Sequence, residues 1–381
     1  MPFHLYQAGI YFVLFAYLLI MVLVEFSIPR KHLKYRQGIA GLSALIFVLF
    51  IGLRWETGTD WEPYKDLFDA IELDWTFLLN VYHFDIGYVL INALVRFFTE
   101  SYTIFLLFDA ALAIIPLFFL LRRVSPYPNV SLMMFYVNYM IAQFMGSNRR
   151  MIAIVLILWF IYYVAVGKKG KSVFALTGAF LFHRSSIANL LIYLVPRKLI
   201  SAKKVFFLLL VSMIVGLSQI PATVIEKIGS VLMPIAGDNE IVQGIEFYSE
   251  NGEEHLVYGT GSLILSTILA LGKRVIFLIP FMYICKRRQV DQLTIFLLNI
   301  YIISFSVYLC TIGSFFQMLT AYWTIVDIIL IGRILCHVKG KAKLGICFFL
   351  CLYGVLQMTS ALNVYPELYM PYLPFWTTIH R

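Results

Sequence analysis

Long apolar runs recur along the chain and alternate with short polar segments, many of them rich in lysine and arginine. A transmembrane helix needs about 20 predominantly apolar residues to cross the hydrocarbon core. The runs that approach this length predict spans at about 8–28, 39–54, 102–121, 131–146, 151–166, 173–183, 205–218, 260–284, 292–312, 317–336 and 344–362. The pattern therefore predicts an all-α integral membrane protein.

Two further apolar segments, at about 86–98 and 186–195, are too short to cross a bilayer comfortably. Partial or re-entrant helices of this kind need protein or a water-filled cavity around them to satisfy the backbone. The predicted fold is a single polytopic membrane domain, residues 1–381, with about 11–13 membrane helices, some of them short or re-entrant.

The basic segments set the predicted orientation. Cytoplasmic loops of membrane proteins are enriched in lysine and arginine, and six loops here carry 19 of the 30 such residues. If the two short segments do not cross, all six loops lie on one side, which the rule assigns to the cytoplasm. The six loops are about 29–38, 122–130, 167–172, 196–204, 285–291 and 337–343.

Carboxylates show the opposite distribution. Residues 56–85 hold eight of the 21, and residues 226–254 hold seven. By the same orientation both groups fall outside, in two acidic periplasmic loops at about 55–85 and 219–258. Three other acidic residues lie inside or near apolar runs, where they either line a pathway or pair helices: Glu25, Asp109 and Asp327.

The composition agrees with this interpretation. Hydrophobic residues make up 61% of the chain and charged residues 13%, against roughly 25% charged in soluble domains. The formal net charge of +9 is mostly a topology signal and does not indicate a nucleic-acid partner. The five cysteines lie in or beside apolar runs, so no disulfide framework is expected. No group of residues has metal-ligand spacing, and we predict neither a metal nor a cofactor.

Four arginines stand at the predicted outer ends of spans, against the charge bias. A single interfacial arginine is commonly an anchor that reaches to water, but arginines that face lipid are costly. Four together instead predict an outward-facing pocket for an anion, because the guanidinium binds phosphate or carboxylate through two parallel hydrogen bonds. The four are Arg54, Arg149, Arg150 and Arg184.

Other polar residues with catalytic potential lie beside these arginines. Asp60 or Asp85 could serve as a general base or as an orienting partner. His183 could transfer protons near neutral pH or simply donate a hydrogen bond.

Five short motifs, in this order, resemble those of one family. "GTDWEPY" (58–64) resembles the G-x-D-x-x-x-Y signature of the EpsG-like, Wzy-type polysaccharide polymerases, and "FDIGYVLIN" resembles their acidic-x-Gly-Tyr segment. "GSNRRMIAI" is similar to their N-x-x-R-Q-x-I-A motif, "FHRSSI" to F-H-x-S-[SA], and "YMPYLPFW" (369–376) to their C-terminal Pro-Tyr. Arg150 stands where the family commonly has Gln, and Asn148 directly precedes Arg149 rather than lying further upstream.

The resemblance implies a polymerase of O-antigen, capsule or exopolysaccharide repeat units, in the bacterial inner membrane with its active site facing the periplasm. Donor and acceptor would be oligosaccharides on undecaprenyl diphosphate, and a chain-length regulator protein is a further implied partner besides membrane lipids. The reaction would be a metal-independent glycosyl transfer.

The roles implied for individual residues follow from that reaction. Arg149, with Arg54 or Arg184, would stabilise the departing diphosphate, and His183 would contact phosphate. Asp60 is the first choice for the base and Asp85 the second. The candidates for substrate binding are Asn148, Arg150, Arg184, Glu56, Tyr64, Asp85, Tyr88, Trp61 and Tyr372.

Two rival functions fit parts of the pattern. A flippase or transporter of the same lipid-linked oligosaccharide would use the same arginines, but it should also need polar groups through the membrane interior. A membrane O-acyltransferase would need a histidine within reach of a cytoplasmic thioester, whereas His183 is predicted on the other side. The polar clusters gather at one face, which favours a one-sided enzyme.

Overall fold

The computed structural model describes residues 6–72, 74, 84–218, 220–221, 223–224, 227, 263–312, 315–340 and 342–377. Much of the two predicted acidic loops, at 75–83 and 228–258, lies outside these residues. The chain divides into two compact units, one of Met1–Asn189 with Ile328–Arg381 and the other of Leu190–Asp327.

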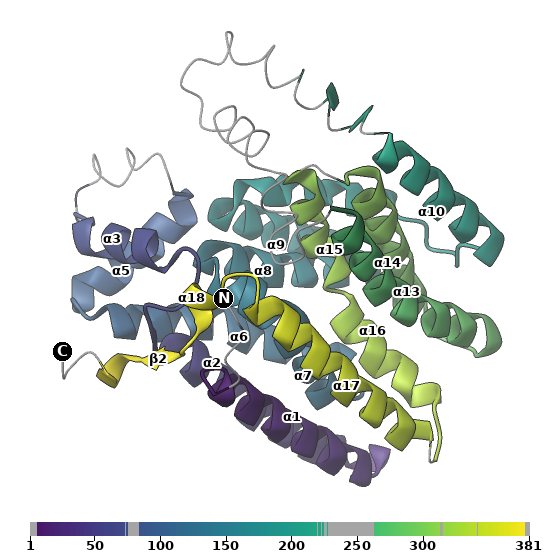
Figure 1. Ribbon diagram of the computed structural model, residues 1–381, viewed down its shortest axis with the longest axis horizontal. Coiled ribbons are helices and arrows are strands. Elements are labelled where there is room, and N and C mark those ends of the chain that lie inside the picture. The colour runs from purple at the N-terminus through teal and green to yellow at the C-terminus, as the bar shows by residue number, and fades with distance from the viewer. Residues whose placement is uncertain are drawn as a thin grey trace. The chain divides into compact units, whose positions relative to one another are not determined.

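The first unit is built from helices and one small sheet (Figure 1). Its helices are α1 (Gly9–Ser27), α2 (Leu33–Gly52), α3 (Trp61–Ala70), α5 (Ile86–Phe98), α6 (Tyr102–Val124), α7 (Pro128–Phe135), α8 (Asn148–Ala165), α9 (Lys169–Phe182), α16 (Asp327–Ile334), α17 (Ala342–Leu362) and α18 (Pro366–Tyr369), together with the short 3-10 helices η1 (Arg30–His32), η5 (Leu335–His337) and η6 (Phe375–Thr377). A π-helix, η2 (Tyr136–Met145), continues α7. The strands β1 (Arg54–Trp55) and β2 (Leu373–Pro374) pair antiparallel.

The second unit contains α10 (Ala202–Leu217), α13 (Leu263–Arg287), α14 (Gln292–Cys310), η4 (Phe315–Thr320) and α15 (Ala321–Thr324). The 3-10 helix η3 (Arg184–Leu194) leads into it. Asn299 on α14 donates from Nδ2 to the carbonyl oxygens of Pro196 and Lys198, both at 2.8 Å. These bonds fix the loop that follows η3 against α14.

Eight helical segments among the described residues are long and apolar enough to cross a membrane. They are Gly9–Ser27, Leu33–Gly52, Tyr102–Val124, Asn148–Ala165, Thr267–Arg287, Gln292–Cys310, Phe316–His337 and Ala342–Leu362. The prediction of an all-α, multi-pass membrane protein is confirmed. The remaining predicted spans also coincide with helices, but shorter ones: 131–146 with α7 and η2, 173–183 with α9, and 205–218 with α10. The segment predicted to be too short to cross, 86–98, is the 13-residue helix α5.

Buried polar residues join the helices of the first unit at the end that carries the basic turn between α1 and α2. Glu25 on α1 is fully buried, and its carboxylate accepts hydrogen bonds from the backbone amides of Asn129 (3.0 Å) and Val130 (3.2 Å) at the start of α7. A carboxylate at a helix N-terminus satisfies amides that have no partner within the helix. Of the two roles that the sequence leaves open for Glu25, the structure supports helix pairing.

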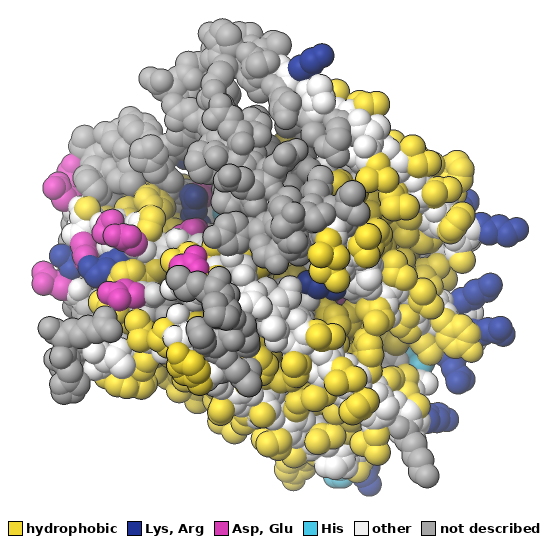
Figure 2. Space-filling model, in the orientation of Figure 1, with side chains coloured by type: hydrophobic (Ala, Val, Ile, Leu, Met, Phe, Trp, Pro, Cys, Tyr) yellow, Lys and Arg dark blue, Asp and Glu magenta, His cyan; other side chains and the backbone are white. Residues whose placement is uncertain are grey.

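Several acidic residues of the first predicted outer loop lie on the exposed face of a short amphipathic helix, α3. Exposed carboxylates on or just after α3 are Glu62, Asp66, Asp69 and Glu72. Figure 2 shows acidic side chains gathered in this region. The opposite face of α3 is apolar and packs on α5 and α6 through Trp61, Tyr64, Leu67 and Phe68. The helix therefore presents charge to water and rings to the core.

Candidate active site

The first motif, 58–64, is brought against the start of α8 by its backbone. Gly58 has φ +116° and donates its amide to the carbonyl of Leu368 at 2.9 Å. Thr59 Oγ1 donates to the carbonyl of Gly146 at 3.0 Å. A side chain at position 58 would collide with the carbonyl oxygen of Met145. Glycine is therefore required here both for its conformation and for the close approach of two chain segments.

We expect Gly58→Ala to destabilise the protein and to impair the site. A non-glycine residue in a sparsely populated backbone region costs about 1–3 kcal/mol, and the clash with Met145 adds to that cost. The matched control is Gly38→Ala in α2, where nothing lies within 4 Å of the added methyl group and alanine favours the helix. Thermal unfolding of the two variants in detergent tests this, and equal melting temperatures would contradict the expectation.

Arg54, a predicted catalytic residue, is buried with 1% of its surface exposed. Its guanidinium donates to the carbonyls of Ile51 (2.6 Å) and Thr57 (3.2 Å) and to Asn148 Oδ1 (2.5 Å). Asn148 in turn donates from Nδ2 to the hydroxyl of Tyr88 at 3.3 Å. Arg54, Asn148 and Tyr88 thus form a buried chain that ties β1, α5 and the first residue of α8 together. This geometry favours a positioning role for Arg54 and Asn148 over direct contact with a ligand.

Two other predicted arginines meet on one carboxylate. Asp85, 6% exposed, precedes α5, and its Oδ2 lies 3.0 Å from Arg149 Nη1. Its Oδ1 lies 3.4 Å from Arg184 Nε and accepts the Arg184 backbone amide at 3.1 Å. The side chains of Arg149 and Arg184 are 29% and 49% exposed. The structure therefore assembles a cationic, partly open site from the start of α8, the start of η3 and the start of α5.

Asp60 lies beside this site at the start of α3. Its Oδ2 is 3.5 Å from the hydroxyl of Tyr64, which also lies 3.1 Å from Ser147 Oγ. Burial raises the pKa of Asp60 above its usual range, although the Thr59 hydroxyl and the charge of Arg149 oppose the shift. Burial likewise raises the pKa of Asp85, against the charges of Arg149 and Arg184. A carboxylate with a raised pKa is a better proton acceptor than an ordinary aspartate.

Ser147 directly precedes α8, but its side chain caps no amide of that helix. Its hydroxyl lies instead beside Tyr64. Ser147 therefore provides no cap at the start of α8, and the positive end of the helix dipole adds to the charge of Arg149. Both features favour an anion at this point.

His183 follows α9 directly, and its Nδ1 lies 2.7 Å from Ser185 Oγ. Burial, together with the charges of Arg150 and Arg149, lowers the pKa of His183 to about 3. The imidazole is therefore neutral at physiological pH. Of the roles predicted for it, hydrogen bonding fits this environment better than proton transfer in the ligand-free protein.

We expect His183→Gln to lower activity without changing its pH dependence. Because the pKa of His183 lies near 3, the ring does not titrate between pH 5 and 8 in the free protein. The pH profile of kcat/KM reports groups of the free enzyme, so the profiles of wild type and variant should run parallel over that range. Loss of a titration step near neutral pH in the variant would show that His183 does carry a proton.

The aromatic residues predicted to bind substrate belong mainly to the core. Trp61, Tyr64, Tyr88 and Tyr372 are each at most 9% exposed. Tyr372 stacks on Phe50 with ring centroids 4.6 Å apart and donates to the Phe50 carbonyl at 2.7 Å. Two half-buried rings lie closer to the surface of the site: Trp55, packed on Trp61, and Phe84, which lies 5.6 Å from the Arg149 guanidinium carbon.

The remaining predicted site residues are Arg150 and Glu56. Arg150 is partly buried, and its charge acts on both Asp60 and His183. Glu56 is exposed at φ +44°, a left-handed conformation that is uncommon for glutamate. Such strained positions often occur at functional sites.

Three residues of the site were not predicted from the sequence. Phe84 and Ser147 lie within the quoted motifs, directly before Asp85 and Asn148, and that position was the only signal for them. Tyr369 is 2% exposed, and burial and the negative charge of Asp60 raise its pKa to about 12. The signal for Tyr369 was its place at the start of the C-terminal motif. Among the described residues no group of three or more His, Cys, Asp or Glu side chains could hold a metal ion.

Comparison with known proteins identifies one family. The model of the EpsG family matches residues 39–375 of the chain. No curated protein and no solved structure gives a match. The matched region contains every predicted site residue described above and, except for the last residue of the C-terminal motif, all five motifs.

Proposed function

Because the chain belongs to the EpsG family, the family of Wzy-type polysaccharide polymerase-like proteins, we propose that it polymerises oligosaccharide repeat units carried on undecaprenyl diphosphate. The growing glycan is transferred to a new lipid-linked repeat unit at the periplasmic face of the bacterial inner membrane. The observation that carries the proposal is the pair Arg149 and Arg184, whose guanidinium groups converge on one carboxylate at a partly open surface.

The arginine pair suits the leaving group of this reaction. A departing diphosphate carries negative charge that grows in the transition state, and preorganised donors aimed at such charge contribute most to catalysis. Arg149 and Arg184 offer guanidinium forks, and the uncapped start of α8 adds its dipole. In the proposed reaction these groups act without a metal.

The transfer uses one base and one leaving group. An acceptor hydroxyl attacks the anomeric carbon of the donor glycan, and the bond from that carbon to the diphosphate oxygen breaks. The diphosphate departs with the electron pair and is held by Arg149 and Arg184. The hydroxyl proton passes to Asp60, which lies beside Tyr64 and feels the charges of Arg149 and Arg150. Trp55 and Phe84 are the rings nearest the surface for contact with sugar faces.

The length of α8 supports the proposed periplasmic position of Arg149. α8 has 18 residues, about 27 Å at 1.5 Å per residue, and Arg149 is its second residue. The helix ends in a turn at Gly167 (φ +72°) that leads into Lys168, Lys169 and Lys171. Arg149 therefore lies nearly one bilayer thickness from a basic turn that the positive-inside rule assigns to the cytoplasm.

A gel of surface polysaccharide tests the proposal. A strain deleted for the gene should show a single repeat unit on the lipid anchor, and wild-type complementation should restore a ladder of chain lengths. That result means that export works and polymerisation fails. Loss of even the single unit would point instead to a flippase or transporter of the same lipid-linked oligosaccharide and would contradict the proposal.

A further inference from the structure

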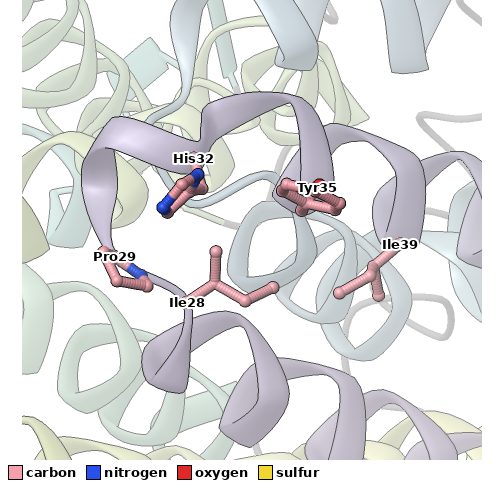
Figure 3. A pocket seen from close by; sticks show the side chains of 5 residues that line it. All are labelled: Ile28, Pro29, His32, Tyr35 and Ile39. Atoms are coloured by element: carbon pink, nitrogen blue, oxygen red, sulfur yellow. The ribbon is translucent and has the colours of Figure 1, made fainter.

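The turn between α1 and α2 forms an open groove that the proposed function does not use. The groove has a volume of about 340 Å³ and is lined by Ile28, Pro29, His32, Tyr35 and Ile39. Figure 3 shows these side chains facing one another across the elbow, with Ile28 and Pro29 on one side and His32, Tyr35 and Ile39 on the other. The lining consists almost entirely of aliphatic and ring carbon.

The wall of the groove is held by a buried arginine. Arg36, 2% exposed, donates from Nε to the carbonyl of Ile28 at 3.1 Å and from Nη1 to that of Pro126 at 3.1 Å. Its guanidinium also lies 4.5 Å from the centre of the Tyr127 ring. These contacts fix the elbow, so the groove is preformed. Because the guanidinium of Arg36 is buried and bonded to these carbonyls, its charge is not available to a ligand in the groove.

The exposed charge around the groove has a single sign. The chain carries no acidic residue between Glu25 and Glu56, and Glu25 is fully buried against α7. Lys31 and Lys34 are exposed and alternate in sequence with the groove residues His32 and Tyr35. An occupant that complements these neighbouring lysines is anionic.

The groove also runs from the membrane boundary into a span. His32 precedes α2, and Ile39 lies seven residues further along it, about 10 Å deeper at 1.5 Å per residue. Neighbouring side chains on α2 are exposed and apolar, with Leu33 at 41% and Leu42 at 51%. A ligand here meets lysines at its upper end and aliphatic carbon at its lower end. An acidic peptide would meet the first of these chemistries but would not extend along a lipid-facing helix.

We propose that this groove is a binding site for an anionic phospholipid. The phosphate lies at Lys31 and Lys34, and one acyl chain lies against Ile28, Tyr35 and Ile39. Two lysines near an anionic headgroup give a preference over a zwitterionic lipid of about tenfold or more. The site is independent of the proposed polymerase reaction, since it uses none of the residues at the arginine pair.

Photolabelling of the purified full-length protein tests the site. The probes are phosphatidylglycerol and phosphatidylcholine that carry the same photoreactive acyl chain, and labelled peptides are mapped by mass spectrometry. We expect residues 28–39 to be labelled about tenfold more by phosphatidylglycerol. Replacing both lysines (Lys31→Gln with Lys34→Gln) should remove this preference, and Ile39→Trp, which narrows the groove, should lower labelling with the lysines intact. The matched control is Lys168→Gln with Lys171→Gln in the basic turn after α8.

Other outcomes overturn the proposal. Equal labelling by the two lipids, or a preference unchanged in the double lysine variant, would mean that this is ordinary lipid-facing surface. Unchanged labelling in Ile39→Trp would mean that no acyl chain occupies the groove. Thermal unfolding of each variant shows that the fold is retained. The polysaccharide gel is scored separately, so failure of the lipid site and failure of the polymerase proposal are distinguishable.

Discussion

Arg149→Ala should abolish polymer synthesis while the protein remains folded in the membrane. Arg149 Nη1 lies 3.0 Å from Asp85 Oδ2. The preceding residue, Asn148, accepts a hydrogen bond from the Arg54 guanidinium. Removing one preorganised donor from a developing anion typically costs 10²–10³-fold in rate. We therefore expect a loss of at least about that size, seen as collapse of the polysaccharide ladder to single repeat units.

Two further variants separate charge from geometry. Arg149→Lys keeps the charge but loses the planar fork, so it should recover only part of the activity. Arg122→Ala is the matched control. Arg122 is exposed in the last turn of α6 and donates a hydrogen bond to Gln37. Arg122→Ala should give normal chain lengths. Normal chain lengths in Arg149→Ala, with protein confirmed in the membrane, would exclude Arg149 from the reaction.

The helices could be predicted from the sequence because the bilayer imposes a length and a polarity on every span. The convergence of Arg149, Arg184 and Asp85 could also be predicted in outline. Arginines at the outer ends of spans must find an anion, and the motifs placed a carboxylate nearby. What the sequence could not supply was the pairing itself, since Asp85 lies 64 residues from Arg149 and 99 from Arg184.

The apolar residues that begin in the first motif follow a helical periodicity that indicates a core role. Trp61, Tyr64, Leu67 and Phe68 recur at the spacing of one helix face, and the structure buries all four. The alternating carboxylates Glu62, Asp66 and Asp69 mark the other face. This periodicity favoured core packing over sugar binding for Trp61 and Tyr64.

Arg54 shows a limit of a different kind. A buried arginine and a ligand-binding arginine look the same in sequence. What distinguishes Arg54 is the set of acceptors around it: two backbone carbonyls within three residues and the amide of Asn148, 94 residues away. Backbone carbonyls are not visible as acceptors until the turn that presents them is known. The same holds for Glu25, whose partners are the amides of α7.

The two candidate bases differ in their surroundings, and this leads to opposite expectations for their amide variants. Asp85 is already engaged by Arg149 and Arg184, so a diphosphate that binds these arginines must compete with it. Asp85→Asn removes a competing anion and should tighten the binding of inorganic diphosphate or undecaprenyl diphosphate. Asp60 is engaged differently: its Oδ2 lies 3.5 Å from the Tyr64 hydroxyl, and the Thr59 hydroxyl also acts on it. Asp60→Asn should leave diphosphate binding unchanged.

Turnover is expected to fall in Asp60→Asn by about 10²–10⁴-fold, the usual contribution of a general base.

The pH dependence gives an independent check with a definite sign. Burial raises the pKa of Asp60, so its carboxyl group stays protonated up to a higher pH than an ordinary aspartate. A base acts only when deprotonated, and kcat/KM should therefore fall on acidification, with a midpoint above the usual range for aspartate. This limb should vanish from the residual activity of Asp60→Asn. If Asp60→Asn keeps both its rate and its acid limb while Asp85→Asn loses them, then the base is Asp85, and the arginines must release it when the diphosphate binds.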